Sequence, residues 1–109
     1  MKLILPYPPA KLSPNARIHW RPKHKIFQKY KSDCYYLAKQ VEPIKKMILT
    51  FHPSCNRPKR NIDNAIASFK AGQDGLADAW GVDDCEFEIL YRIKFGEVIK
   101  GGAVIIEPL

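Results

Sequence analysis

The spacing of apolar residues changes once between Ile62 and Phe95, and this change constrains the fold more than any other feature. Before Gly81 the apolar residues recur at intervals of three, four and seven, which predicts a helix of about five turns that ends at that glycine. After Gly81 they alternate with polar residues, which predicts a long amphipathic strand. The helical stripe comprises Ile62, Ile66, Phe69, Leu76 and Trp80, and the alternating strand runs from Cys85 to Phe95.

The other segments follow the same two periods. A helix is expected at about 27–41, and strands are expected at 2–5, 46–52 and 103–107. Glycines at 96 and 101–102 border the loop before the last strand, which predicts an antiparallel hairpin there. The expected fold class is therefore α+β, with a small mixed β-sheet, two α-helices and a C-terminal β-hairpin. A chain of 109 residues is expected to form one domain, residues 1–109.

Composition restricts the class of protein further. Hydrophobic residues make up 46% and charged residues 27%, as in globular proteins, and no apolar run is long enough to span a membrane. We also expect no signal peptide, because the apolar start is interrupted by Pro6. Three widely spaced cysteines favour neither a disulfide framework nor a zinc site. A cytoplasmic protein is expected, and so small a core makes a homodimer reasonable.

Charge is distributed unevenly along the chain. The net charge is +7, and residues 1–32 contain eight lysines and arginines but no acid. Such a surface suits a polyanion such as DNA, although solvation alone also explains many basic surfaces. Aromatic rings among these cations could stack on bases. The candidate DNA-binding residues are Arg17, Trp20, Arg21, Lys23 and Lys25, together with the basic loop residues Arg57, Lys59 and Arg60.

Seven of the 11 acidic residues lie between positions 63 and 88. Asp63, Lys70 and Asp74 fall on one face of the predicted helix, and the Asp83–Asp84 pair lies in the turn into the next strand. If that strand packs beside the helix start, Asp63 and Asp84 converge. Two carboxylates about 5 Å apart repel by roughly 3 kcal/mol at an effective dielectric of 20, and a hard cation such as Mg²⁺, or Mn²⁺ as a substitute, would remove this repulsion. The alternative is that these acids only solvate exposed faces and a turn.

Three segments resemble the RusA family of Holliday-junction resolvases: the opening LPYPPAKLSPN, the basic run RPKRNIDN and the turn GVDD. By position, the resemblance implies that Asp63 and Asp84 bind a metal, with Asp83 as the neighbouring acid, and that Lys70 is the catalytic lysine. Asn61 stands where the family usually has a further metal-binding aspartate, but its amide oxygen can still coordinate a hard cation. The interval from Asp63 to Lys70 is about three residues longer than is usual in the family, close to one helical turn.

The resemblance implies a Mg²⁺-dependent endodeoxyribonuclease that resolves four-way DNA junctions by paired symmetric nicks, in DNA recombination and repair. Its partners would be branched DNA and a second copy of the chain, and it would act on the nucleoid in the cytoplasm. The competing hypothesis is a basic DNA-binding or architectural protein that has lost nuclease activity. An RNA-binding module is disfavoured, because the sequence has neither RNP-like aromatic strands nor a GxxG clamp.

Overall fold

A mixed sheet forms the centre of the structure, a computed structural model that describes residues 2–13, 20–53, 62–93 and 99–109. Its four strands lie in the order β1-β4-β2-β3. Strand β4 is antiparallel to both of its neighbours, whereas β2 and β3 are parallel. The strands are β1 (Leu3–Leu5), β2 (Lys46–His52), β3 (Glu88–Ile93) and β4 (Ala103–Pro108).

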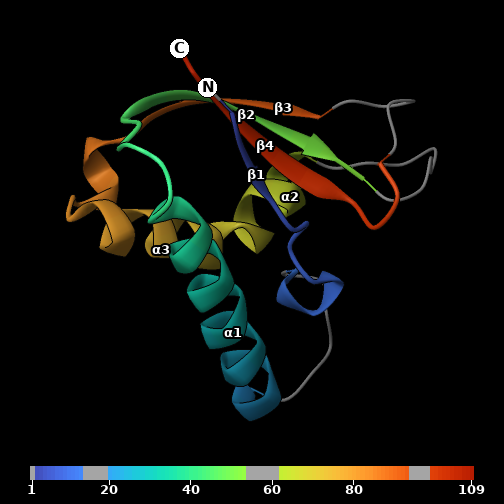
Figure 1. The fold of residues 1–109 in the computed structure, drawn as a ribbon. Coiled ribbons are helices and arrows are strands. Elements are labelled where there is room, and N and C mark those ends of the chain that lie inside the picture. Colours follow the sequence, from blue (N-terminus) through green and yellow to red (C-terminus); the bar gives the residue numbers. More distant parts are fainter. Residues whose placement is uncertain (1, 14–19, 54–61, 94–98) are drawn as a thin grey trace.

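Three α-helices cover one face of this sheet (Figure 1). They are α1 (Trp20–Ala38), α2 (Ile62–Ser68) and α3 (Lys70–Trp80), and two short 3-10 helices, η1 (Ala10–Leu12) and η2 (Asp84–Glu86), lie in the connections. Helices α1 and α3 approach closely at Gly75, where an added Cβ would lie 2.4 Å from the carbonyl oxygen of Lys31. This contact requires a residue without a side chain.

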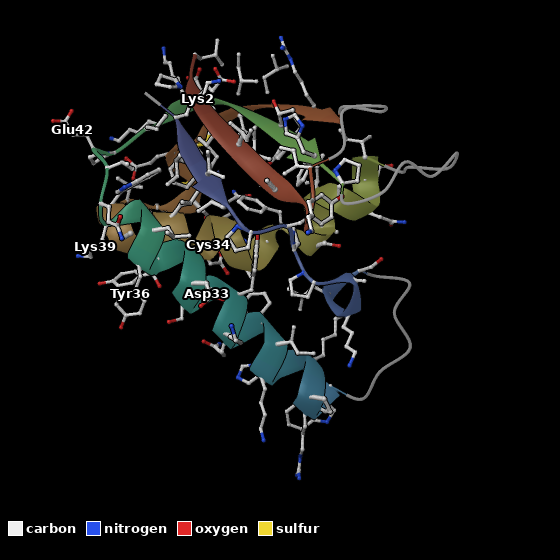
Figure 2. All side chains as sticks on the ribbon, turned by 45° about the vertical axis from the view of Figure 1, so that its right-hand side comes forward. Lys2, Asp33, Cys34, Tyr36, Lys39 and Glu42 are labelled. Carbon is white, nitrogen blue, oxygen red and sulfur yellow. The ribbon has the colours of Figure 1, made fainter. Side chains whose placement is uncertain are left out.

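The core lies between the helices and the inner face of the sheet. Met47, Leu49 and Phe51 alternate along β2 and are fully buried, and the Phe51 ring meets Phe69 edge-on at 6.1 Å between centroids. On α1, Cys34 is buried whereas Tyr36 points away from the molecule (Figure 2). The period-two and helical patterns of the sequence therefore correspond to the buried faces of these elements.

The α+β fold class is confirmed, and several boundaries are close to those expected. Strand β2 has the predicted bounds, and α3 is followed by Gly81, which adopts the left-handed conformation at φ 63°. Helix α1 begins at Trp20, seven residues before the predicted start. Pro22 is tolerated there, because the first turn of a helix needs no intrahelical N–H donor.

The predicted C-terminal hairpin is wrong. Strands β3 and β4 are not neighbours, since β2 lies between them and pairs with both. Strand β2 is buried along almost its whole length, whereas β3 exposes Leu90 and takes the edge. The strand with the largest number of buried residues thus has a hydrogen-bonded neighbour on each side.

The helix expected at 62–80 is interrupted at Phe69, so the described residues form three α-helices where two were predicted. The Phe69 N–H is shared between the carbonyls of Ala65 and Ile66, at 3.1 Å each, and ψ of Phe69 is −1°. Its ring is buried against Tyr30 and Phe51. Leu76 is buried as the stripe predicted, but Ile62 at the other end is exposed.

In the part of the chain that the structure describes, no helix is both long and apolar enough to cross a membrane.

Candidate functional site

Lys70 is held between two carboxylates at the start of α3. Its Nζ donates a hydrogen bond to Oδ2 of Asp84 and lies 2.9 Å from Oδ1 of Asp74. Asp74 follows Lys70 by one helical turn, whereas Asp84 comes from η2, 14 positions away in the sequence. We call these three residues the Lys70 cluster.

Two local features turn Asp84 back towards α3. The left-handed Gly81 ends the helix and reverses the chain. Asp83 then caps η2 through a capping box, in which its side chain accepts from the Cys85 N–H at 3.3 Å and its own N–H donates to Glu86 Oε2 at 2.8 Å. The capping box fixes the orientation of η2, and Asp84 can therefore reach the lysine.

The contact between Lys70 and Asp84 keeps both of these groups charged. The hydrogen bond that Lys70 donates holds the pKa of the Asp84 carboxyl below its usual value. The same interaction with Asp84, and then that with Asp74, raises the pKa of the Lys70 ammonium group. At neutral pH the site therefore presents one ammonium group and ionised Asp84 to the solvent.

This pairing predicts a pH-dependent contribution to stability. Because the pKa of Asp84 is lower in the folded state, its contribution is present above the ordinary aspartate pKa and disappears as pH falls through the folded value. Asp84→Asn should therefore lower the melting temperature at neutral pH but not in strong acid. Melting curves recorded from neutral to strongly acidic pH check this prediction. In a Lys70→Met background, the change in melting temperature caused by Asp84→Asn should depend little on pH. If the change in melting temperature caused by Asp84→Asn were independent of pH when Lys70 is present, the Lys70–Asp84 pairing would be contradicted.

A surface cavity of about 480 Å³ adjoins the cluster. Its lining includes four carboxylates, from Asp74, Asp78, Asp83 and Asp84, and one lysine, Lys31 of α1. Lys31 is paired with Asp78 at 3.1 Å. The predominantly acidic lining suits a cation or a cationic group more than an anion.

The sequence did not indicate a role for Lys31 or Asp78 at this site. They reach the cavity because α1 packs on α3, with Gly75 at the contact between the two helices. No local spacing links positions 31 and 78, so only the helix packing could reveal the pair.

Asp63 occupies the first turn of α2, and its side chain is exposed. It precedes Lys70 by seven residues, and the interruption at Phe69 lies between them. The structure thus brings together Lys70, Asp74 and Asp84, while the convergence of Asp63 with Asp84 stays a prediction. Asn61 lies outside the described residues.

The described residues do not by themselves form the predicted metal site. Within residues 2–13, 20–53, 62–93 and 99–109, no group of three or more His, Cys, Asp or Glu side chains is arranged to hold a metal ion. The oxygen ligands of Asp83 and Asp84 are of the type that Mg²⁺ prefers. Asp63, Asp83 and Asp84 are all described, so these three carboxylates do not form such a group, and the predicted site would also need the amide oxygen of Asn61.

The predicted DNA-binding residues divide into two groups. Arg17, Arg57, Lys59 and Arg60 lie outside the described residues. Trp20, Arg21, Lys23 and Lys25 lie in the first two turns of α1, with the Trp20 side chain exposed. Lys31, which lines the cavity beside the Lys70 cluster, follows Trp20 by 11 residues, or roughly 16 Å along the helix axis.

No protein-family model matches the chain. The chain is 34% identical, over 113 residues, to an uncharacterized protein of Xylella fastidiosa, and the match covers 95% of this chain and 72% of that protein. The matched part of the chain therefore includes α1, α2, α3 and the Lys70 cluster. This chain belongs to the same protein family as the Xylella fastidiosa protein.

Proposed function

We propose that this protein is a Mg²⁺-dependent endodeoxyribonuclease of the RusA type, which resolves four-way DNA junctions in recombination and repair. The observation that carries the proposal is the contact between Lys70 and Asp84. The RusA resemblance implies a catalytic role for the first residue and metal binding for the second. Their contact across 14 positions supports one common site.

Each member of the Lys70 cluster has a distinct role in this proposal. The Lys70 ammonium group stabilises the charge that develops on the phosphoryl oxygens during hydrolysis. Asp84, kept ionised by its lowered pKa, would hold the metal together with Asp63, and Asp83 and Asn61 would assist. A Mg²⁺ ion bound by these oxygens would acidify a water molecule and polarise the phosphate. Asp74 orients Lys70 from one helical turn away.

Phosphate contacts come from the basic residues at 17–25 and 57–60. They bind the DNA backbone without regard to sequence, and this electrostatic binding weakens as the salt concentration rises. The protein would thereby remain associated with the nucleoid, in the cytoplasm.

A homodimer belongs to the same proposal, because two symmetric nicks require two active sites related by a dyad. The outer face of the sheet offers an apolar surface for this contact. Ile4 is 60% and Leu90 47% exposed, and each lies beside a further isoleucine on the neighbouring strand, Ile105 and Ile48 respectively. No described helix covers this face (Figure 1).

Twice the chain mass of 12.5 kDa predicts a species of about 25 kDa in sedimentation experiments. Mixed dimers that carry one Asp63→Asn subunit should nick one strand without resolving the junction. A monomer that makes paired symmetric cuts would contradict the dimer.

The competing function is a DNA-binding protein that does not cleave. Two observations favour it: the part of the chain that the structure describes holds no three-ligand metal group, and Lys70 already neutralises charge at Asp84. Such a protein would bind junctions through its basic surface alone.

A synthetic four-way junction, labelled on each strand in turn, separates the two functions. A nuclease should release paired, symmetrically placed products with Mg²⁺ or Mn²⁺ and nothing in EDTA, whereas a linear duplex of the same sequence stays intact. A binder shifts the junction in EDTA and never cuts it. Absence of cleavage at every metal concentration would overturn the proposal.

A further inference from the structure

The N-terminal end of α1 carries an exposed aromatic surface that the Lys70 cluster does not use. Trp20, Lys23, His24 and Phe27 line a cavity of about 330 Å³. Their spacing of three, four and seven residues places all four on one face of the helix. The Trp20 side chain is 66% exposed, although a ring of this size is usually largely buried.

The second tryptophan, Trp80, has a structural role that contrasts with the exposed position of Trp20. Trp80 is half-buried, its Nε1 donates to the carbonyl of Ala38 at 3.0 Å, and its ring meets Phe87 edge-on. Trp20 belongs instead to the surface, where the Arg21 guanidinium lies 5.5 Å from its ring centroid. A cation beside an exposed ring can contact a phosphate while the ring contacts an apolar plane.

The charge around this surface has one sign. Helix α1 has no acid in its first turn, and the first acid in the whole chain is Asp33, which is paired with Lys29 at 3.0 Å. Lys23 lines the cavity itself, and Arg21 and Lys25 are its neighbours in sequence. An occupant should therefore combine a flat apolar face with negative charge.

An unpaired nucleotide has this combination. A base supplies a π-face that any exposed ring can stack on, and its phosphate supplies the charge. The bases of an intact duplex already stack on one another and expose only their edges, so they cannot lie on Trp20. The cavity volume is at the lower end of the roughly 300–1,000 Å³ range of small-ligand sites, which suits one nucleotide more than a peptide helix.

We propose that Trp20 and Phe27, with the cations Arg21 and Lys23, form a stacking site for an unpaired nucleotide of single-stranded DNA. The inference rests on the proposed function, because it identifies unpaired nucleotides as the part of the branched DNA substrate that this end of α1 binds. The site would select DNA with unpaired bases, while the Lys70 cluster acts on the phosphodiester.

The test uses oligothymidylate as the probe, in EDTA, so that cleavage plays no part. In a Trp80→Phe background the remaining tryptophan emission comes from Trp20, and it should be quenched by the oligonucleotide and much less by a blunt duplex. Trp20→Ala should weaken oligothymidylate binding by roughly 10- to 100-fold, the usual effect of removing a stacked ring, while duplex binding stays the same. Trp20→Phe should restore much of the affinity, because it keeps a ring.

Two controls make the outcome decisive. Lys25→Ala should weaken single-stranded and duplex binding alike, and Trp20→Ala should melt at the wild-type temperature because its side chain is exposed. Unchanged emission, or equal losses for both DNA forms in Trp20→Ala, would overturn the inference. Junction cleavage without quenching of the Trp20 emission would refute only the stacking site. Quenching without any junction cleavage would refute only the nuclease.

Discussion

Replacing Asp84 by asparagine is expected to lower the rate of junction cleavage by roughly 10³ while junction binding is retained or slightly tightened. The substitution removes a metal ligand and also a negative charge near the bound phosphate. It leaves an isosteric side chain, so η2 and its capping box should persist. Single-turnover cleavage of a labelled junction, measured beside a gel-shift titration in EDTA, separates the two effects.

Asp78→Asn is the matched control. Asp78 lines the same cavity on α3, but it is paired with Lys31 and is not a predicted ligand, so its loss should leave the cleavage rate close to that of the wild type. Asp63→Asn should behave like Asp84→Asn. Near-normal cleavage in both Asp63→Asn and Asp84→Asn would show that the active site lies elsewhere.

Lys70→Met should lower the cleavage rate constant by about 10²–10³, the usual effect of removing one group that stabilises transition-state charge. Methionine keeps much of the length of the lysine side chain but has no ammonium group. The substitution also removes the first cause of the lowered Asp84 pKa. The acid limb of the pH–rate profile should therefore move to higher pH, which a purely structural role of Lys70 would not produce.

Lys31→Met controls for the loss of a positive charge at this cavity. Lys31 lines the cavity from α1 and pairs with Asp78, yet it contacts neither of the carboxylates that hold Lys70 in the described cluster. We expect its cleavage rate and pH profile to stay close to those of the wild type. Equal losses in Lys31→Met and Lys70→Met would mean that net charge, and not Lys70 itself, supports the reaction.

Several features of the molecule could be predicted from short intervals of sequence. The alternation in residues 46–52 predicted β2, because successive side chains of a strand point to opposite faces. Gly81 predicted the end of α3, because glycine readily adopts the left-handed conformation found there. The interval of four residues between Lys70 and Asp74 placed their side chains on one helical face, and the structure pairs them.

The interruption at Phe69 could not be predicted in the same way. The apolar stripe includes residues on both sides of Phe69, and the break accompanies the burial of the Phe69 ring against Tyr30 of α1 and Phe51 of β2. Those partners lie 39 and 18 positions away in the sequence. Local helix propensity is weak enough to be overridden by tertiary packing of this kind.

The sequence by itself determined the α+β class, the period of most elements and the placement of Lys70 and Asp74 on one helical face. These features follow from the spacing of residues within short segments. Only the tertiary structure decided that β2 lies between β3 and β4, that Asp84 reaches Lys70 and that Lys31 reaches Asp78. Strand order and long-range ion pairs depend on which apolar surfaces bury one another, and neither a period nor a motif records that choice.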